Sequence, residues 1–240
     1  MQIPAIILAA GRGTRLGDLT ARTPKALLRV GGKTLLQHRI ESIRSVLPGS
    51  GIHVITGFMP EAFRPFSTLP DVQLHPFEEA ATANNIVSLL LALDAIGTDS
   101  GFYLFNSDVI SDNAILEALR DSPADDALVV DPSSRDAEAM KVSAKPDGRL
   151  DAIAKTLDPA ISLGEYIGIA RFSPDGAAQL HEILHAIVRV EKRTSDWYEA
   201  AIHRLFSLRP VRVSLIPVAS RWIEIDTPED LARAKTLFPS

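Results

Sequence analysis

Short apolar segments alternate with amphipathic segments up to about residue 130, and this alternation limits the fold more than any other feature. Apolar runs of strand length occupy 4–8, 52–56, 102–105 and 127–130. Apolar residues at helical spacing occupy 35–46, 82–93 and 114–119. Strands that alternate with helices form a mostly parallel sheet covered on both faces. The sequence therefore predicts an α/β fold.

The pattern changes near Met140, where strand-like segments follow one another with few helices between them. These strands are expected at 141–143, 150–154 and 166–172, and they predict antiparallel pairs added to the sheet. Two helices (176–188 and 197–206), two strands (211–218 and 222–225) and a helix from Pro228 complete the chain. Because residues 1–240 contain no repeat, linker or low-complexity tract, we expect a single domain.

Composition excludes several classes of protein. The net charge is −5, from 25 basic and 30 acidic residues, so no basic excess exists to bind nucleic acid. Cysteine is absent, which excludes disulfides, thiolate metal sites and a cysteine nucleophile. We find neither a signal-peptide pattern nor an apolar stretch long enough to span a bilayer. We expect a cytoplasmic protein with no nucleic-acid or membrane partner.

The first strand is followed by the glycine-rich stretch LAAGRGTRLG at 8–17. A dinucleotide-binding turn needs G-x-G-x-x-G, but Leu16 stands at the third glycine position and Gly17 comes one residue late. A Walker A loop also fails, because GGKT at 31–34 has Leu27 where the first glycine belongs. The stretch is neither of these two phosphate-binding loops.

Small residues and cations nevertheless suit this stretch to a phosphate ligand. The small residues are Ala9, Ala10, Gly11 and Gly13, whose backbone can approach a ligand and point N–H groups at it. Arg15 adds a bidentate charged donor, and Lys25 follows the stiffening Pro24. A tight turn with solvated arginines is the alternative.

Carboxylates follow two of the predicted strands. Ligands of such sheets bind beyond the carboxyl ends of the strands. Asp108 lies just past 102–105, and strand alternation places Glu224 and Asp226 on one face. Asp226 is not needed for the helix cap that Thr227 supplies. Mg²⁺ takes oxygen ligands, usually with one or two carboxylates, so these residues predict a magnesium site, with a cap or turn role for Asp108 as the alternative.

The segment HEILH, at His181 to His185, matches the H-E-x-x-H pattern of zinc proteases. However, an apolar stripe formed by Leu180, Ile183, Leu184 and Ile187 accounts for the helix and leaves both histidines on its flank. No histidine or glutamate stands at a convincing third-ligand position. We interpret the segment as a half-exposed helix face.

Taken together, LAAGRGTRLGDLTARTPKALLRVGGKTLLQHRIE resembles the N-terminal signature of nucleotidyltransferases, a family that includes sugar-1-phosphate nucleotidylyltransferases and small cytidylyltransferases. NSDVI and WIEIDTPEDLARA resemble the family's metal-binding segments. TANNIVSLLLAL and DWYEAAIHRLF are similar to the N-N-I-x-S helix and the acceptor helix of cytidylyltransferases for phosphocholine and 2-aminoethylphosphonate. Since the sequence stops soon after the EID strand, we expect no C-terminal repeat domain of the kind found in the larger sugar enzymes.

The resemblance implies a Rossmann-like, GT-A-like nucleotidyltransferase fold with an antiparallel acceptor-side extension. It implies an enzyme that uses Mg²⁺ to transfer CMP from CTP to a small phosphonate or phosphomonoester and releases pyrophosphate. A sugar-1-phosphate or inositol-1-phosphate nucleotidylyltransferase is the alternative. A non-catalytic nucleotide-binding regulatory subunit is a further alternative, which the intact Arg15, Lys25, Asp108 and Asp226 disfavour. The enzyme could act as a homodimer.

The resemblance also assigns residues. Arg15 and Lys25 are the expected catalytic pair, which stabilises the triphosphate and the leaving group. The expected nucleotide-binding residues are Leu8, Ala9, Ala10, Gly11, Gly13, Thr14, Arg15, Lys25, Thr82, Asn85 and Ser88. The expected metal ligands are Asp108, Glu224 and Asp226, and the expected acceptor contacts are Lys155, Glu165, Tyr198 and Glu199.

A cationic amine on the acceptor is one hypothesis for its identity. Three aromatic and three acidic side chains could enclose such an amine by cation–π and charge contacts: Trp197, Tyr198, Trp222, Asp196, Glu165 and Glu199. Aromatic residues at helical spacing also occur in protein cores. Without the cage, an anionic or polyol acceptor becomes the better hypothesis.

Overall fold

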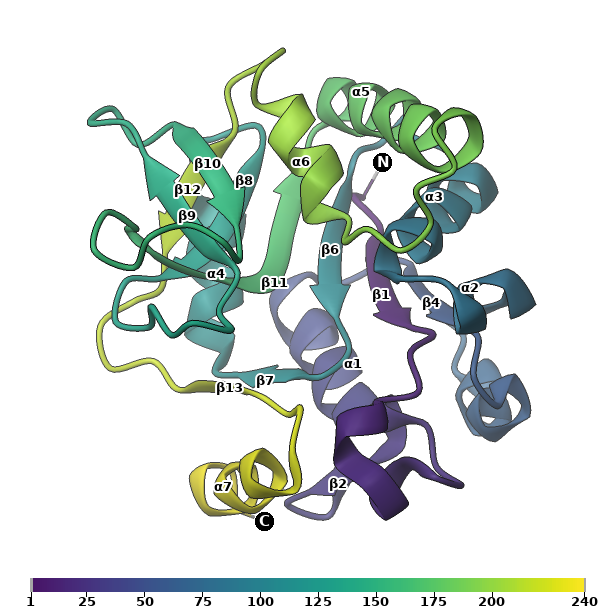
Figure 1. Cartoon of the computed structure of the whole chain (residues 1–240). Helices are drawn as coiled ribbons and strands as arrows, with labels where there is room; N and C mark the ends of the chain where they lie inside the picture. The colour runs from purple at the N-terminus through teal and green to yellow at the C-terminus, as the bar shows by residue number, and fades with distance from the viewer. Residues whose placement is uncertain (1, 240) are drawn as a thin grey trace.

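A central mixed sheet organises the computed structural model, which describes residues 2–239 (Figure 1). Its strands run in the order β10-β9-β11-β6-β1-β4-β5, with β8 paired to β11 and β12 paired to β8. The parallel part contains β1 (Ala5–Ala9), β4 (Ile52–Thr56), β5 (Val72–Pro76) and β6 (Phe102–Asn106). The remaining strands are β8 (Ala127–Asp131), β9 (Lys141–Ala144), β10 (Leu150–Ala154), β11 (Gly164–Phe172) and β12 (Arg212–Leu215).

Strand β11 joins the two halves of the sheet, because it pairs antiparallel with β6, β8 and β9. Strands β9 and β10 form a further antiparallel pair. The predicted α/β fold with an antiparallel extension is therefore confirmed, and the extension lies beside the end of β6 that leads to Asp108.

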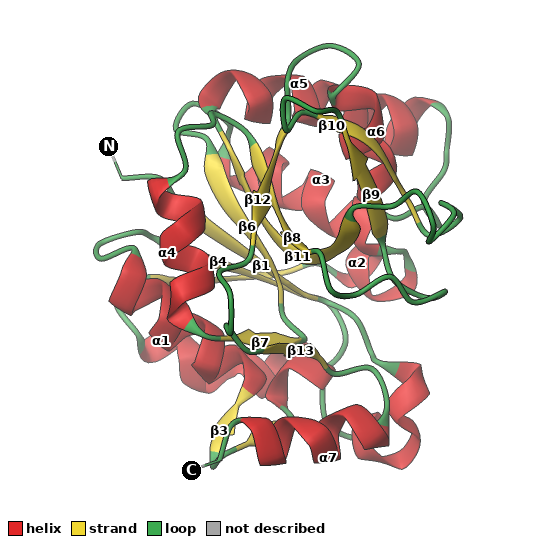
Figure 2. Cartoon of the chain, turned by 90° about the vertical axis from the view of Figure 1, so that its left-hand side faces the viewer, coloured by secondary structure: helices red, strands yellow, loops and turns green. Residues whose placement is uncertain are grey.

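Helices cover both faces of the sheet (Figure 2). One core lies between the sheet and the helices α3 (Asn85–Ile96), α5 (Pro174–His185) and α6 (Glu199–Leu205). The other lies between the sheet and α1 (Leu35–Val46), α4 (Asn113–Asp121) and the 3-10 segment η3 (Pro60–Thr68). The apolar residues of strands β1 and β6 contribute to both cores, as expected of central parallel strands.

A third, smaller core lies beyond the carboxyl ends of these strands. It joins the opening 3-10 segment η1 (Thr14–Thr20), the short ribbon of β7 (Val109–Ser111) and β13 (Trp222–Glu224), and helix α7 (Pro228–Leu237). Leu16, Ile110, Ile223 and Leu231 are buried in it. The hairpin of β2 (Arg29–Val30) and β3 (Lys33–Thr34) also contributes. This packing brings the opening loop next to the C-terminal carboxylates.

The predicted helix over 82–93 is wrong at its start. The chain instead forms α2 (Glu78–Thr82), an extended break at Ala83 and Asn84, and then α3 from Asn85. The break occurs because the Asn84 side chain caps α3 and the Asn84 backbone N–H bonds Thr194 in a distant loop. The helix propensities of residues 82–93 do not reveal such a tertiary contact.

Other differences concern ends and short elements. The short strands β2, β3 and β7, strand β5 and the 3-10 segments were not predicted. Helix α5 begins at Pro174 because Ser173 caps it, and it continues through a π turn at Ala186–Val190. Helix α6 begins at Glu199 rather than Trp197. Within residues 2–239, every helix is too short or too polar to cross a bilayer.

Candidate active site

Three carboxylates meet where the small third core joins the main sheet. Asp108, Glu224 and Asp226 each offer an oxygen atom that lies within 4.8 Å of the other two. Asp108 follows β6, and β13 pairs with β7 so that Glu224 stands opposite Val109. The predicted juxtaposition of these residues is therefore present in the structure. Their role as metal ligands stays a prediction.

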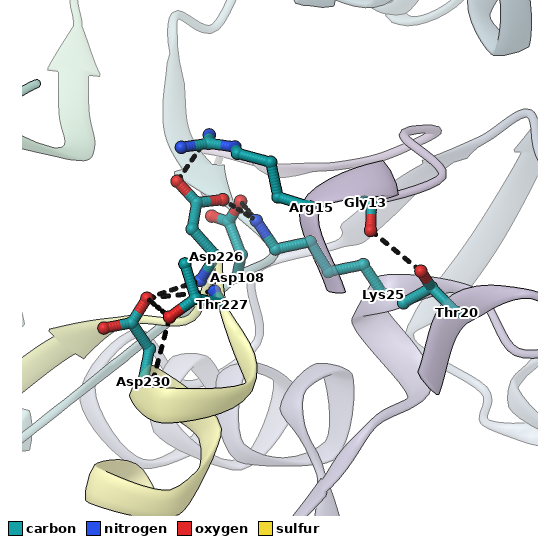
Figure 3. A network of polar contacts seen from close by, with 8 residues as sticks. All are labelled: Gly13, Arg15, Thr20, Lys25, Asp108, Asp226, Thr227 and Asp230. Atoms are coloured by element: carbon teal, nitrogen blue, oxygen red, sulfur yellow. Dashed lines mark hydrogen bonds and ion pairs between the residues drawn. The ribbon is translucent and has the colours of Figure 1, made fainter. Parts of the chain in front are cut away.

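Lys25 bridges two of these carboxylates (Figure 3). Its Nζ lies 2.7 Å from Oδ2 of Asp108 and 2.5 Å from Oδ1 of Asp226, and the residue is only 8% exposed. Burial disfavours the charged form, but the two aspartates outweigh burial and raise the pKa of Lys25 above its ordinary value. Lys25 is thus a permanent ammonium at the centre of the cluster.

Arg15 adds a second cation from the opening loop. Its Nη2 lies 2.6 Å from Oδ2 of Asp226, while half of the side chain is exposed. Figure 3 shows Arg15 and Lys25 approaching Asp226 from the same side. The exposed guanidinium is free to turn toward an anionic ligand at little cost, because an exposed ion pair is worth little.

Gly13 makes room for the lysine. Its φ of 74° is left-handed, and a Cβ there would lie 3.0 Å from Cβ of Lys25. The Gly13 carbonyl accepts a hydrogen bond from the Thr20 hydroxyl at 2.8 Å, which closes the turn. A glycine is therefore required both for the backbone conformation and for the passage of the Lys25 stem.

The cluster has unsatisfied negative charge. Oδ1 of Asp108 is buried and has no hydrogen-bond partner. Burial, together with the charges of Asp108 and Asp226, raises the pKa of Glu224 to about 8. A buried carboxylate oxygen without a donor is costly, and a cation ligand would remove that cost. An all-oxygen donor set of this kind suits Mg²⁺.

Lys155 and Glu199 are two of the predicted acceptor contacts, and that role stays a prediction. Lys155 follows β10, and its Nζ lies 5.1 Å from the centroid of the Trp197 ring. Glu199 is 6% exposed, and its Oε2 has no hydrogen-bond partner. Burial raises the pKa of Glu199 to about 7, although the charge of Lys155 opposes this shift. The charge of Lys155 therefore acts on this buried carboxylate.

Tyr198 is wholly buried, and its hydroxyl group donates to Oδ1 of Asn106 at 3.2 Å. The same hydroxyl lies 3.0 Å from that of Tyr166. The predicted contact of Tyr198 with the acceptor stays a prediction, and the structure shows a second role in supporting Asn106, two residues before Asp108. Asn106 was expected near the site because it follows the apolar run 102–105, but no role was expected for its side chain or for Tyr166, which begins the predicted strand 166–172.

The three aromatic residues of the hypothetical cage have different partners. The Trp197 ring lies against Nζ of Lys155, and the Tyr198 hydroxyl donates to Asn106. Nε1 of Trp222 donates to Oδ2 of Asp131 at 2.6 Å. Asp196 forms an ion pair with Arg193. Glu165 accepts from the Ser134 hydroxyl, and burial raises the pKa of Glu165. Each aromatic side chain is thus engaged with a group of the protein itself, which counts against an aromatic enclosure of a ligand.

The predicted nucleotide side is formed by the end of β1 and the loop after it. Leu8, Ala9 and Ala10 are buried, whereas Gly11 and Thr14 are exposed. Thr82 is exposed at the end of α2, and Ser88 is buried one turn into α3. Whether these residues contact a nucleotide stays a prediction.

The two asparagines of the N-N-I-x-S segment tie two loops together. Nδ2 of Asn84 donates to the Ser195 carbonyl at 3.0 Å, and the Asn84 N–H donates to the Thr194 carbonyl at 2.9 Å. Oδ1 of Asn85 accepts from the Tyr198 N–H at 2.9 Å. The predicted nucleotide segment therefore positions the chain that leads to Glu199, a role that the sequence analysis missed.

The HEILH segment lies away from the carboxylate cluster. Nε2 of His181 lies 2.6 Å from Oδ1 of Asp94, and His185 is exposed. Leu180, Leu184 and Ile187 are buried, which confirms the apolar stripe.

A Rossmann-like sheet whose first loop faces acidic residues at the strand ends is the architecture of a nucleotidyltransferase. The chain belongs to the family described as "MobA-like NTP transferase domain", whose model matches residues 5–185. This match confirms the predicted family.

Relatives include cytidylyltransferases. The 2-aminoethylphosphonate cytidylyltransferase of Lancefieldella rimae is 26% identical over 233 residues, which cover 95% of this chain and 90% of that protein. The CMP-5'-(3-aminopropyl)phosphonate synthase of Streptomyces rubellomurinus is 30% identical over 155 residues, 62% of this chain but only 24% of that protein. The chain thus spans about a quarter of the latter relative's length.

The fold is shared with a solved enzyme. The CTP:phosphocholine cytidylyltransferase of Streptococcus pneumoniae superposes with a TM-score of 0.79 at 22% identity, over 99% of both chains. This likeness confirms the predicted nucleotidyltransferase fold.

Proposed function

We propose that this protein is a cytidylyltransferase that transfers CMP from CTP to a small phosphonate or phosphomonoester, with release of pyrophosphate. The observation that carries the proposal is the Lys25 bridge between Asp108 and Asp226 beside the glycine-rich loop. A buried ammonium ion and three carboxylates beside that loop would suit the binding of a triphosphate and a divalent ion. The cytidylyltransferase relatives support CTP as the nucleotide.

The chemistry needs charge neutralisation and alignment more than a protein nucleophile. An oxygen of the acceptor attacks the α-phosphorus of CTP, the new P–O bond forms, and the bond to the bridging oxygen of pyrophosphate breaks. Backbone N–H groups of the opening loop, Arg15 and Lys25 bind the triphosphate and the departing charge. Asp108, Glu224 and Asp226 would hold Mg²⁺, which supplies further charge neutralisation when bound.

Lys25 has two sets of anionic partners in this proposal. In the structure its ammonium ion contacts both aspartates. A divalent ion held by the same aspartates would compete with the ammonium ion for their oxygens. Binding of metal and nucleotide together would turn Lys25 from the carboxylates to the phosphates. The positive charge of Lys25 would then offset part of the negative charge of the triphosphate.

The acceptor is proposed to carry both a phosphoryl group and an amine. Lys155 would bind the phosphoryl dianion, as a compact charge on a flexible stem can. Glu199 would bind the amine, because its buried Oε2 has no hydrogen-bond partner in the protein. An ammonium ion beside Glu199 would favour the ionised carboxylate and remove the cost of its burial.

A pyrophosphate-release screen tests this proposal. Each of CTP, UTP, ATP and GTP is paired with 2-aminoethylphosphonate, 3-aminopropylphosphonate, phosphocholine, inositol-1-phosphate and glucose-1-phosphate in the presence of Mg²⁺. The proposal predicts the highest kcat/KM for CTP with an amine-bearing acceptor. A clear preference for UTP with a sugar-1-phosphate would support the alternative nucleotidylyltransferase and overturn this one.

A further inference from the structure

Arg39 is a wholly buried cation that the proposed chemistry does not use. It lies on α1, is 2% exposed, and places its guanidinium carbon 4.9 Å from the centroid of the Phe105 ring. Its Nη2 donates to the Val109 carbonyl at 2.8 Å. Between residues 2 and 239 no carboxylate forms an ion pair with it. Burial lowers the pKa of Arg39 to about 10, against the charge of nearby Asp108.

Two contacts of Arg39 lie on either side of Asp108, and Nη1 also lies 3.5 Å from the Ser111 hydroxyl oxygen. Phe105 belongs to the end of β6, and Val109 begins β7, so the guanidinium spans the turn that carries the aspartate. Other contacts also hold this turn: the Ser107 N–H donates to the Leu8 carbonyl, the Ile225 N–H donates to the Asp108 carbonyl, and Nζ of Lys25 contacts Oδ2 of Asp108. Oδ1 of Asp108, by contrast, has no donor. A fixed planar group behind the turn therefore limits how the carboxylate can move.

Burying this cation is costly, so its contacts matter. An unpaired charge in an apolar layer costs free energy that a methionine or leucine of similar size would avoid. Arginine also offers what lysine lacks, namely a plane that stacks on Phe105 while an edge N–H binds a carbonyl. These two contacts, rather than a general need for packing, account for an arginine at position 39.

We propose that Arg39 is a positioning residue for Asp108. Its guanidinium holds the 105–109 turn so that the Asp108 carboxylate presents its oxygens to a divalent ion. The contacts of Arg39 are with Phe105, Val109 and Ser111, none of which is assigned to the nucleotide or the acceptor, so its effect on the reaction would pass through Asp108. The inference rests on the metal role of Asp108 in the proposed function.

Binding of Mn²⁺ to the nucleotide-free protein, measured by electron paramagnetic resonance, tests the proposal without measuring activity. Arg39→Met should raise the Mn²⁺ dissociation constant about tenfold, the loss expected from one hydrogen bond made by a charged group. Arg39→Lys should lie between wild type and Arg39→Met. Arg44→Met is the matched control, because Arg44 is an exposed arginine of the same helix that pairs with Asp71. The control should bind Mn²⁺ as wild type does.

The control variant Asp108→Asn separates the two proposals. If Asp108→Asn binds Mn²⁺ as tightly as wild type, the metal assignment in the proposed function fails. If Asp108→Asn loses binding while Arg39→Met binds as tightly as wild type, or more tightly, only the positioning role of Arg39 is overturned. Tighter binding would show that Arg39 acts as an opposing charge.

If Arg39→Met fails to fold, a rescue experiment with a second variant still tests the proposal. A cavity of about 440 Å³, lined in part by Arg39, Ser42, Ser111 and Phe238, adjoins the guanidinium. Arg39→Ala would enlarge it enough to admit free guanidinium ion at millimolar concentration. Guanidinium should restore Mn²⁺ binding, whereas urea, which has the same shape and no charge, should not. Equal effects of the two solutes, or no effect of either, would overturn the proposal.

Discussion

Nζ of Lys25 and Oδ1 of Asp226 lie 2.5 Å apart, and this ion pair joins the 3-10 segment η2 (Lys25–Leu27), which follows the opening loop, to the residues after β13. The two residues come from opposite ends of the chain and meet only because the small third core packs η1 against β13 and α7. The same aspartate also contacts Arg15. A single carboxylate thus organises both cations of the candidate active site.

Lys25→Ala should lower kcat about a hundredfold or more, since removal of a preorganised charge contact typically has such an effect. The measurement is steady-state pyrophosphate release at saturating CTP and acceptor. Lys33→Ala is the control, because Lys33 is exposed and pairs only with Glu41. Near wild-type turnover in Lys25→Ala would remove Lys25 from the mechanism.

Asn84→Ala should raise the acceptor KM several-fold and leave the KM for CTP nearly unchanged. The side chain of Asn84 bonds the Ser195 carbonyl, so its loss loosens the loop that leads to Glu199. Typical hydrogen bonds contribute about 1 kcal/mol, which corresponds to roughly fivefold. An equal rise in both KM values would show that Asn84 acts on the whole site.

Lys155→Ala and Glu199→Gln should affect different parts of the acceptor. Lys155→Ala should weaken every acceptor, because each carries a phosphoryl dianion. Glu199→Gln should weaken 2-aminoethylphosphonate and phosphocholine but barely change an acceptor without an amine. The KM of each acceptor is measured for both variants. If Lys155→Ala weakens only CTP, the division into two sites is wrong. If Glu199→Gln changes no acceptor, an anionic or polyol acceptor becomes the better hypothesis.

The buried carboxyl group of Glu199 should make stability depend on pH. Its pKa is raised by burial to about 7 from an ordinary 4.5, so the folded chain holds this proton when the unfolded chain has lost it. The free energy of unfolding should therefore fall as pH rises from about 4.5 to 7 and then level off.

Urea denaturation of the metal-free protein across this pH range provides the measurement. Glu199→Gln should have a shallower fall than wild type, because glutamine has no proton to lose. Glu224 contributes a fall of the same sign, with its own pKa raised to about 8, so some slope should persist in the variant. An unchanged slope in Glu199→Gln would contradict the assignment.

The parts of the fold and site that could be predicted from the sequence depend on local hydrophobic and capping patterns and on the topology of a parallel sheet. Apolar runs predicted the central strands, and the Thr227–Asp230 capping box predicted the start of α7. Because the carboxyl ends of parallel strands share one edge, Asp108 and the residues of the opening loop were expected to meet. The spacing of Glu224 and Asp226 on a short strand placed both on one face.

Other features depend on contacts that no local pattern shows. Arg39 stands in the polar run QHRIE, which is typical of a solvated helix face, and only packing against Phe105 reveals its burial. The break before α3 exists because Asn84 and Asn85 bond residues more than a hundred positions away. Tyr198 looks like a ligand-facing aromatic residue in an acidic segment, yet the fold buries it behind Asn106.

The most direct test of the proposed activity is mass spectrometry of the product formed from CTP, Mg²⁺ and 2-aminoethylphosphonate. The account predicts a CMP–aminoethylphosphonate adduct in equal amount to the pyrophosphate released, at a kcat/KM well above that with UTP. Cytosine offers an amine donor where uracil offers an acceptor, so a site built for one leaves polar groups unpaired with the other. The adduct should vanish in Asp108→Asn. Equal rates with CTP and UTP, or an active Asp108→Asn enzyme, would contradict the account.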